Sequence, residues 1–364
     1  MSHIIKIFNH AIVPFRNRYN HHPATLNPWL AEHAPGAGTA IALEKIGIGQ
    51  SNPTYRLVTD QDRFILRMQP PGELLPSAHA VDREYRVMDA LAATAVPVPR
   101  MIALCTDIEV IGVKFFIMEH IAGSTIMDPG LGDLAMAERE GLYLDQVDIL
   151  AELARLDPAA IGLDGFGRPS GYLGRQIAIW TKQYRASETG LISDMEYLME
   201  TLPGCIAGET AIDEMGLCVL HGDFRLDNLI INTAVQCRIT ALIDWELSTL
   251  GPPFVDLSYW CAMLRMSAEW PIGGLGGVDR ATLGIPDEAA LIGRFCTRIG
   301  LQKPHNWEAW IAFQLFRFSA ILQGVKKRWV DGNASASNAA EVGGQAVPVA
   351  ELGARTLRAF LNKG

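Results

Sequence analysis

The 364-residue sequence lacks several features that mark special classes of protein. No uninterrupted apolar run reaches about eighteen residues, the length that a membrane-spanning helix needs, so we expect no membrane span. Cysteine is sparse: the six cysteines are scattered and form no Cys-x-x-Cys pair. This pattern argues against a zinc site and indicates reduced core cysteines in a cytoplasmic protein.

Positive charge is also in deficit. The formal net charge is -9, which argues against general nucleic-acid binding but is compatible with a small-molecule substrate, cationic or not. Hydrophobic residues make up 49% of the chain and charged residues 20%, as in ordinary globular proteins. The length is sufficient for two lobes with separate cores.

The beginning of the chain does not match the rest. Its apolar part is interrupted by Lys6, Asn9 and His10, and no small-residue cleavage site follows, so it does not have the form of a signal peptide. We expect residues 1–24 to form a loosely held extension ahead of the folded sequence.

Two short apolar runs in the second half deliver polar groups at their ends. Residues 219–220 are followed by His221 and Asp223 and then by Asn228, while a later run ends at Asp244. Such runs predict buried strands, whose ends hold side chains rigidly. Phosphoryl transfer needs this rigidity, because a hydroxyl must be positioned and Mg²⁺, which prefers oxygen ligands, must be held on nucleotide phosphates.

The pattern His-x-Asp-x-x-x-x-Asn, followed by an apolar run ending in Asp, resembles the catalytic and metal-binding loops of protein-kinase-like enzymes. His-Gly-Asp and Ile-Asp-Trp-Glu make it similar to the aminoglycoside phosphotransferase branch. The resemblance implies that Asp223 is the base for the substrate hydroxyl and that Asn228 and Asp244 hold Mg²⁺. It further implies that Arg225 meets the γ-phosphate and that His221 supports the loop.

A glycine-rich turn between two predicted strands occurs near the start of the folded sequence. Gly47 and Gly49 let backbone N–H groups approach phosphates closely, and Ser51 adds a hydroxyl donor. The pattern alone is typical of many hairpins, and the third glycine of a full kinase loop is absent. Its position before a strand-borne cation favours nucleotide binding.

That cation is Arg67, at the end of a strand predicted over residues 63–67. Glu84 lies on a helix predicted over residues 77–91. The resemblance implies that Arg67 pairs with the α- and β-phosphates and with Glu84, although arginine stands where lysine is usual. A plain surface salt bridge is the alternative interpretation.

Residues 110–114 and 115–123 predict a hairpin that runs into a connector. In kinase-like folds this connector is the hinge between the lobes. The resemblance therefore implies that the adenine ring uses backbone groups near Glu119 to Ile121.

A subfamily resemblance extends over most of the chain. The motifs at residues 50–55, 70–79 and 171–185 resemble kinase-like domains fused to acyl-CoA dehydrogenases, and their stand-alone bacterial relatives. This implies a hydroxyacyl-CoA as substrate. Three basic residues of the last motif then either face CoA phosphates or form a solvated helix face: Arg175, Lys182 and Arg185.

The sequence after Asp244 bears on the kind of substrate. Only a short stretch separates Asp244 from Asp256, which disfavours the long activation segment of a protein kinase. We expect Asp256 to hold the catalytic-loop backbone at a helix start and Asp227 to be solvated or capping. Residues 332–349, rich in small polar residues, are predicted to be a loop.

We therefore predict an α+β, bilobal protein-kinase-like fold. The N-lobe, residues 25–122, contains a small antiparallel sheet, and the C-lobe, residues 123–364, is mainly helical. The cofactors are ATP and Mg²⁺, and the acceptor is a small-molecule hydroxyl, with hydroxyacyl-CoA ahead of an aminoglycoside-like compound. A nucleotide-binding pseudokinase module is a further alternative, favoured by Arg67 and the reduced glycine loop and opposed by the intact catalytic set. The choice between ATP and GTP and the oligomeric state stay open.

Overall fold

The computed structural model describes residues 23–46, 52–71, 79–206, 215–234, 237–334 and 338–362. The chain divides into two compact units, and the division falls after Ala122, with residues 94–97 grouped with the second unit. None of the helices in these ranges has the length and apolar character needed to cross a membrane.

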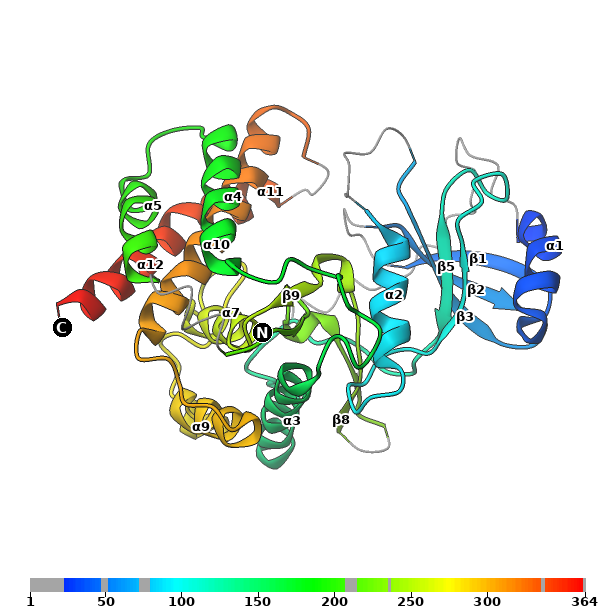
Figure 1. The fold of residues 1–364 in the computed structure, drawn as a ribbon, viewed down its shortest axis with the longest axis horizontal. Helices are drawn as coiled ribbons and strands as arrows, with labels where there is room; N and C mark the ends of the chain where they lie inside the picture. The colour runs from blue at the N-terminus through cyan, green and yellow to red at the C-terminus, as the bar shows by residue number, and fades with distance from the viewer. Residues whose placement is uncertain are drawn as a thin grey trace. The chain divides into compact units, whose positions relative to one another are not determined.

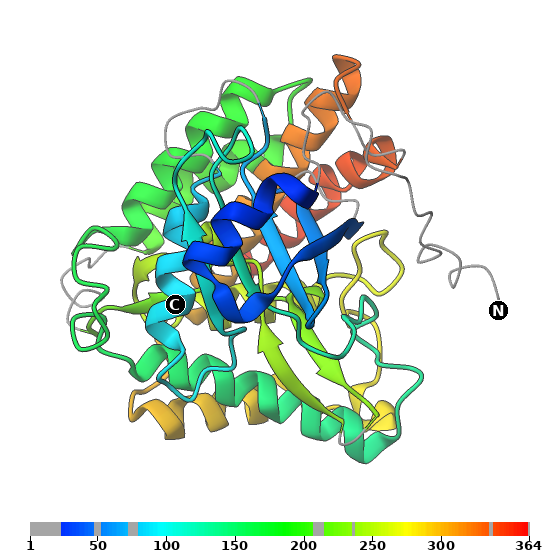
Figure 2. The same cartoon turned by 90° about the vertical axis from the view of Figure 1, so that its right-hand side faces the viewer.

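The first unit is a five-stranded antiparallel sheet with the strand order β1-β2-β3-β5-β4 and two helices (Figures 1 and 2). The helices are α1 (Pro23–His33) and α2 (Val81–Leu91). The strands are β1 (Ala40–Ile46), β2 (Thr54–Thr59), β3 (Arg63–Met68), β4 (Met101–Cys105) and β5 (Phe115–Glu119).

Both faces of the sheet are buried at its central strands β3 and β5, and the alternation of strand residues decides which side chain faces which helix. The ring of Phe115 in β5 packs against the ring of Trp29 in α1, with 4.9 Å between the ring centroids. The ring of its neighbour Phe116 packs against Tyr85 in α2, with 6.1 Å between the centroids. Arg67 lies directly opposite Phe116 in the β3–β5 ladder and therefore shares its face. The pleat thus turns Arg67 toward α2.

The hairpin predicted from residues 110–114 and 115–123 is wrong in its first strand. β5 pairs with β4, and residues 108–112 form a turn instead. The backbone N–H of Gly112 donates to the carbonyl of Ile108 at 2.6 Å, and Gly112 adopts φ +86°. The left-handed glycine closes the turn where a strand was expected.

The second unit is mainly helical and is built around one long buried helix, α10 (Trp307–Val330), which packs against α4, α5, α7, α11 and α12 (Figure 1). The other helices are α3 (Met136–Arg155), α4 (Tyr172–Ser187), α5 (Ser193–Cys205), α7 (Val255–Arg265), α8 (Arg280–Leu283), α9 (Glu288–Ile299), α11 (Ala339–Gly344) and α12 (Ala346–Leu361). The apolar periphery of α10 explains its burial, since a helix that is apolar nearly all round needs neighbours on every side.

Two short antiparallel strand pairs, seen in the described part of this unit, position its polar motifs. One pairs β6 (Cys218–Leu220) with β9 (Thr249–Gly251), and the other pairs β7 (Leu229–Asn232) with β8 (Arg238–Leu242). The predicted short strands before Asp223 and Asp244 are therefore present.

The loop predicted over residues 332–349 is wrong over much of its length, because α11 lies within it and α12 begins at Ala346. Close packing accounts for the helix: a Cβ atom on Gly343 would lie 2.7 Å from the backbone of Lys326 in α10. Small residues that suggest a loop here allow a helix to approach α10 instead. At the other end, α1 begins at Pro23, and residues 1–22 of the expected extension lie outside the described residues.

Phe254 gives a test of the second core. Its ring is fully buried and contacts the rings of Phe295, Trp307 and Trp310. We expect Phe254→Ala to lower the free energy of unfolding by about 3–5 kcal/mol, measured by urea denaturation followed by circular dichroism. Trp329→Ala is the control, since Trp329 is 52% exposed and its loss is expected to cost no more than about 0.5 kcal/mol. Equal losses for the two variants contradict this account of the core.

Candidate active site

The first motif forms a loop between two short strands of the second unit. β6 leads into His221, and the loop runs through Asn228 into β7. Gly222 adopts φ +85°, and a Cβ atom there would lie 2.5 Å from the carbonyl oxygen of Leu247. Glycine alone tolerates both the left-handed backbone and this close approach. The path of the loop therefore requires the glycine that precedes Asp223.

The carboxylate of Asp256 holds the backbone of this loop. Asp256 lies in the first turn of α7 and is almost fully buried. Its Oδ2 accepts a hydrogen bond from the N–H of His221 at 2.6 Å, and its Oδ1 accepts one from the N–H of Gly222 at 3.0 Å. Burial raises the pKa of Asp256, while His221, the two N–H donors and Arg317 oppose that rise. The structural position predicted for Asp256 is confirmed.

His221 supports the loop from inside the protein. It is fully buried and packs edge-on against the ring of Trp245 at 4.7 Å. Its Nε2 donates to the carbonyl of Ile243 at 2.9 Å, and its Nδ1 accepts from the N–H of Asp223 at 3.2 Å. With both ring nitrogens engaged, His221 fixes the loop against the segment that carries Asp244.

Two side chains orient the carboxylate of Asp223. The hydroxyl of Tyr259 donates to Oδ1 at 2.6 Å, and the amide of Asn228 donates to Oδ2 at 3.2 Å and to the backbone carbonyl of Asp223 at 2.9 Å. Burial, and then the charge of Asp223, raise the pKa of Tyr259, which keeps its hydroxyl a donor. Tyr259 was not predicted, although its place one helical turn after Asp256 was an available signal.

Arg317 of α10 is a second residue that sequence analysis missed. It is 6% exposed, and its guanidinium donates to the carbonyl of Gly222 at 2.6 Å. The central carbon of the same guanidinium lies 5.1 Å from the ring centroid of Tyr259 and 5.5 Å from that of Trp180. The peptide that precedes Asp223 is thus held at both ends, by Arg317 at its carbonyl and by the His221 ring at its N–H.

Asn228 and Asp244 are brought together by the β7–β8 hairpin. Leu229 pairs with Leu242, and the N–H of Ile243 donates to the carbonyl of Asn228 at 2.9 Å. Asp244 adopts a left-handed backbone with φ +67° and ψ +61°, which is strained for a residue other than glycine. Such outliers concentrate at functional sites, where the surrounding structure enforces them.

The side chain of Arg225 is largely buried and forms a bidentate ion pair with Asp227. Its Nε donates to Oδ1 at 2.9 Å, and a second guanidinium nitrogen donates to Oδ2. Asp227 was interpreted as solvated or capping, and this is wrong, because the pair is half-buried and closes one wall of a cavity. The two partners are only two residues apart, so the loop forms this bidentate pair without help from another element.

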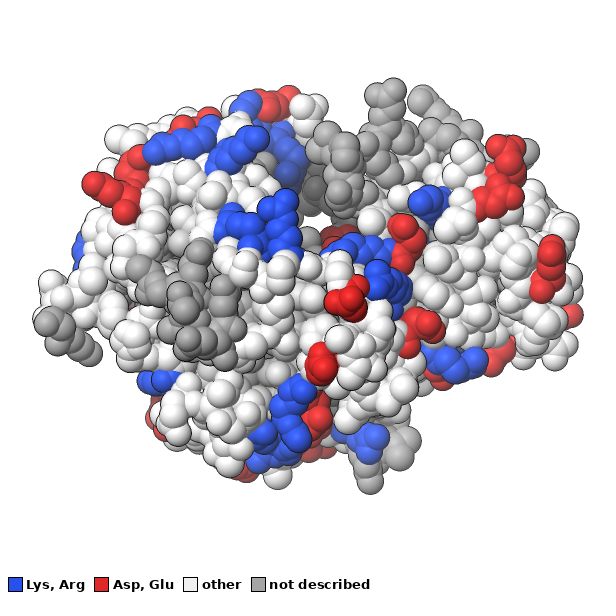
Figure 3. Space-filling view, in the orientation of Figure 1, with Lys and Arg blue, Asp and Glu red and all other residues white. Residues whose placement is uncertain are grey.

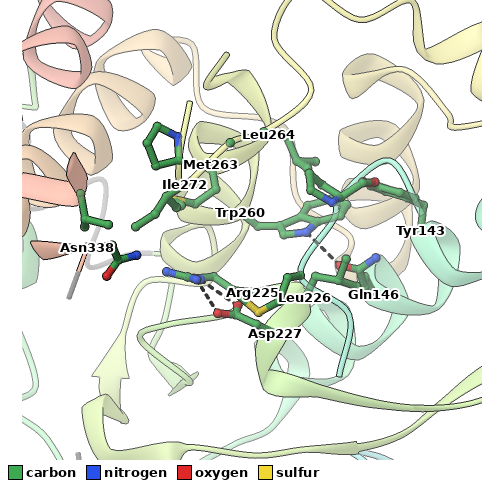
Figure 4. A pocket seen from close by; sticks show the side chains of 16 residues that line it. Tyr143, Gln146, Arg225, Leu226, Asp227, Trp260, Met263, Leu264, Ile272 and Asn338 are labelled. Carbon is green, nitrogen blue, oxygen red and sulfur yellow. Dashed lines mark hydrogen bonds and ion pairs between the residues drawn. The ribbon is translucent and has the colours of Figure 1, made fainter. Parts of the chain in front are cut away.

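This cavity lies wholly within the second unit and has a volume of about 330 Å³ (Figure 4). Most of its wall is apolar, with side chains from the segment after residue 126, from α3, from α7 and from residues 271–274. The lining includes Met127, Pro129, Tyr143, Trp260, Met263, Leu264 and Ile272, with Arg225, Leu226 and Asp227 from the loop.

In the first unit, Arg67 and Glu84 form a buried ion pair. The Nε of Arg67 donates to Oε2 of Glu84 at 2.9 Å, and the two residues are 8% and 2% exposed. Asn52 donates to the same carboxylate oxygen at 3.3 Å, and Arg67 also donates to the hydroxyl of Thr54 at 3.3 Å. Burial excludes the alternative of a plain surface salt bridge.

The other predicted nucleotide-binding residues lie at the end of β5 or outside the described residues. Glu119 ends β5, where its N–H donates to the carbonyl of Arg100 at 2.9 Å. Ile121 follows in the segment that leaves the sheet. Three predicted residues lie outside the described residues: Gly47, Gly49 and Ser51.

The basic residues of α4 differ from one another. Arg185 is engaged by Glu196 at 2.5 Å and by Glu188 at 2.7 Å, so it serves ion pairs of the protein itself. Lys182 is exposed and lines a second, open cavity against α5, and Arg175 lies two helical turns earlier. Figure 3 shows Lys and Arg side chains gathered over the region of α4, a local excess on an acidic chain.

The buried pair of the first unit predicts a clear energetic asymmetry. We expect Arg67→Met to lower the free energy of unfolding by about 3–5 kcal/mol, because Glu84 is left buried without its cation. Urea denaturation of the variant checks this value. The control is Arg56→Met, which breaks a partly exposed ion pair of the same sheet, Arg56 with Glu44, and is expected to cost less than about 1 kcal/mol. A cost for Arg67→Met as small as that of the control contradicts the buried pair.

Asp256 predicts a second asymmetry. An asparagine can accept with one oxygen only, so Asp256→Asn leaves one buried loop N–H facing an NH₂ group. We expect a loss of about 1–3 kcal/mol in the free energy of unfolding. Asp331→Asn, which breaks an exposed pair with Lys327, is the matched substitution and is expected to change stability by less than about 1 kcal/mol. Thermal unfolding of both variants decides, and identical midpoints count against a structural role for Asp256.

Comparison with known proteins places this geometry in a family. A sequence profile described as the phosphotransferase enzyme family, APH, matches residues 42–292. The mouse protein named acyl-CoA dehydrogenase family member 10 is 41% identical over 324 residues, which cover 89% of this chain and 30% of that protein. The chain thus spans less than half the length of this relative, and it matches the subfamily predicted from the sequence.

Solved structures agree on the fold. A crystal structure from Ralstonia eutropha, designated provisionally as an aminoglycoside phosphotransferase, has 41% identity and a TM-score of 0.83, and the match covers 92% of this chain and 98% of that one. The aminoglycoside phosphotransferase APH(4)-Ia, solved with ADP and hygromycin B, is only 15% identical, with a TM-score of 0.59 over 91% of this chain and 98% of that one, and supports the fold alone. The predicted α+β, bilobal kinase-like fold is confirmed, and the chain belongs to the phosphotransferase enzyme family.

Proposed function

We propose that this protein is an ATP-dependent phosphotransferase that moves the γ-phosphate to a hydroxyl of a small molecule. One observation carries the proposal: Asp223, Asn228 and Asp244 are linked through one hydrogen-bonded frame, in which Asn228 contacts Asp223 by its side chain and Ile243 by its backbone. Phosphoryl transfer relies on such positioning more than on covalent chemistry by the protein.

In this proposal Asp223 orients the acceptor hydroxyl and takes its proton. Tyr259 and Asn228 fix the carboxylate, so its orientation is set before the substrate binds. The acceptor oxygen then bonds to the γ-phosphorus as the bond from that phosphorus to the bridging oxygen of ADP breaks. The products are a phosphate ester and ADP, with the hydroxyl proton on Asp223.

Asn228 and Asp244 are proposed to hold Mg²⁺. They offer an amide oxygen and carboxylate oxygens, a donor set that fits this hard cation. The amide nitrogen of Asn228 is committed to Asp223, which leaves the amide oxygen for a metal. When bound, the metal neutralises charge on the nucleotide phosphates. The strained backbone of Asp244 accords with a side chain placed for function rather than for stability.

The remaining nucleotide contacts are proposed from the family resemblance. Arg67, oriented by Glu84, is assigned to the α- and β-phosphates, and its fixed fork of donors suits phosphate oxygens. Gly47, Gly49 and Ser51 are assigned to the phosphates through their backbone and hydroxyl donors, and residues 119–121 to adenine. Arg225, held by Asp227, is assigned to the γ-phosphate.

For the acceptor, we favour a hydroxyacyl-CoA. The name of the mouse relative connects it with acyl-CoA metabolism, and the cavity beside the catalytic loop is mostly apolar. An aminoglycoside, such as the hygromycin B bound to APH(4)-Ia, is a polycation that calls for acidic partners. Among the described residues that line the cavity, the one carboxylate is Asp227, and Arg225 already neutralises it.

A pseudokinase is disfavoured because Asp223, Asn228 and Asp244 are all present.

Asp223→Asn tests the chemistry. The purified protein is incubated with Mg-ATP and a panel of 4-hydroxyacyl-CoAs and aminoglycosides, and mass spectrometry detects the added phosphoryl group. We expect wild type to modify the CoA thioesters and Asp223→Asn to lower kcat about 10²–10⁴-fold with ATP binding retained. Tyr259→Phe, which removes one donor to Asp223, is expected to lower kcat about tenfold.

Asp331→Asn is the control, because this exposed residue pairs only with Lys327 among the described residues. Modification of aminoglycosides alone overturns the choice of acceptor. Full activity of Asp223→Asn overturns the assignment of the base, and bound ATP with no transfer to any compound favours the pseudokinase.

A further inference from the structure

We propose that the apolar cavity beside the catalytic loop binds the alkyl tail of the acceptor, on the far side of its reactive hydroxyl, and so selects the length of that tail. This inference rests on the proposed function of Asp223. It assigns a ligand class, an unbranched hydrocarbon chain, to the cavity lined by these described residues (Figure 4).

The cavity walls suit hydrocarbon. Met263 and Leu264 of α7 and Ile272 of the following segment converge with Met127 and Trp260 on the same space. Unbranched methionine side chains adapt to chains of different shape, and the indole offers a large flat surface. A volume of about 330 Å³ is at the small end of ligand sites, which suits a short tail better than a whole CoA ester or a multi-ring sugar.

Most polar side chains of the walls already have partners within the protein, and the amide of Asn338 is the exception among the described lining residues. The Nε1 of Trp260 donates to Gln146 at 3.1 Å, and the amide nitrogen of Gln146 donates to the carbonyl of Leu142 at 3.2 Å. The hydroxyl of Tyr143 donates to the carbonyl of Pro129 at 2.7 Å.

Arg225 and Asp227 complete this set as a bidentate pair. A ligand rich in hydroxyl or amino groups would lose water in the cavity and find few partners, which is costly. A hydrocarbon chain has no hydrogen bonds with water to lose, and its transfer from water into the cavity is favourable.

The cavity is lined by residues of both elements that hold the Asp223 carboxylate. On α7, Tyr259 donates to Asp223 while the next residue, Trp260, lines the cavity. On the loop, Asp223 is followed within a few residues by Leu226, which also lines the cavity. In this inference the hydroxyl carbon of the acceptor lies at Asp223 and its alkyl tail extends toward this hydrocarbon-lined space.

Ile272 allows a test in both directions. Its backbone N–H is anchored by Gln345 at 3.1 Å and its half-buried side chain lines the cavity, so its size can be changed where the backbone is held. Initial rates are measured with Mg-ATP and saturated 4-hydroxyacyl-CoAs from 4-hydroxypentanoyl to 4-hydroxydodecanoyl, for wild type, Ile272→Trp and Ile272→Ala. The control pair is Ile179→Trp and Ile179→Ala, since Ile179 is an exposed residue of α4 that does not line the cavity.

For wild type, we expect kcat/KM to rise about fourfold for each added methylene until the cavity is filled, and then to level or fall. Ile272→Trp is expected to lower kcat/KM at least tenfold for tails longer than its new limit while the shortest substrate changes less than threefold. Ile272→Ala is expected to move the limit to longer tails, and this result does not depend on the tryptophan variant folding. A length profile that both Ile272 variants leave unchanged overturns the inference, while transfer itself still supports the proposed function.

A binding measurement separates the two proposals. Calorimetry with 1-hexanol, 1-octanol and 1-decanol reports occupation of the cavity with no phosphoryl transfer. Binding by wild type that Ile272→Trp weakens at least tenfold and Ile179→Trp does not supports the cavity assignment, even if no hydroxyacyl-CoA is phosphorylated. Absence of such binding, together with a flat length profile, overturns it.

Discussion

The catalytic loop depends on one buried carboxylate. Asp256 accepts the backbone N–H groups of His221 and Gly222 with its two oxygens, and it does so in the first turn of α7, where the helix dipole favours negative charge. A loop with a left-handed glycine has few regular hydrogen bonds of its own, so an outside acceptor must satisfy its donors. Asp256 thus sets the backbone path that leads to Asp223, whose carboxylate Tyr259 and Asn228 then orient.

The same helix also serves the chemistry beyond the loop. One turn after Asp256, Tyr259 reaches the Asp223 carboxylate, and the following residue, Trp260, turns toward the cavity. Arg317 of α10 adds a buried cation that meets both the loop carbonyl and the Tyr259 ring. Packing of α7 against α10 therefore couples the core of the unit to the orientation of the Asp223 carboxylate, since rigid elements hold side chains more accurately than loops.

Two ion pairs of this protein, Arg67 with Glu84 and Arg225 with Asp227, differ in burial and in what they hold in place. Arg67 with Glu84 is buried, and its value lies in holding a cation in one orientation, because desolvation offsets much of its attraction. Arg225 with Asp227 is half-buried and pairs the one carboxylate found among the described residues that line the cavity. The proposed preference for a hydrocarbon tail over a polycation depends on this pairing.

The sequence by itself determined the fold class and the local motifs. Three local features follow from rules of burial and backbone freedom, and each is present in the structure: the short apolar runs before Asp223 and Asp244, the strand that carries Arg67 and the glycine after His221. Local rules failed where distant packing decides: the helix at Ala339–Gly344 forms because a glycine approaches α10. Tyr259 and Arg317 were missed, and Asp227 was misjudged, because only the tertiary structure brings their partners within hydrogen-bonding distance.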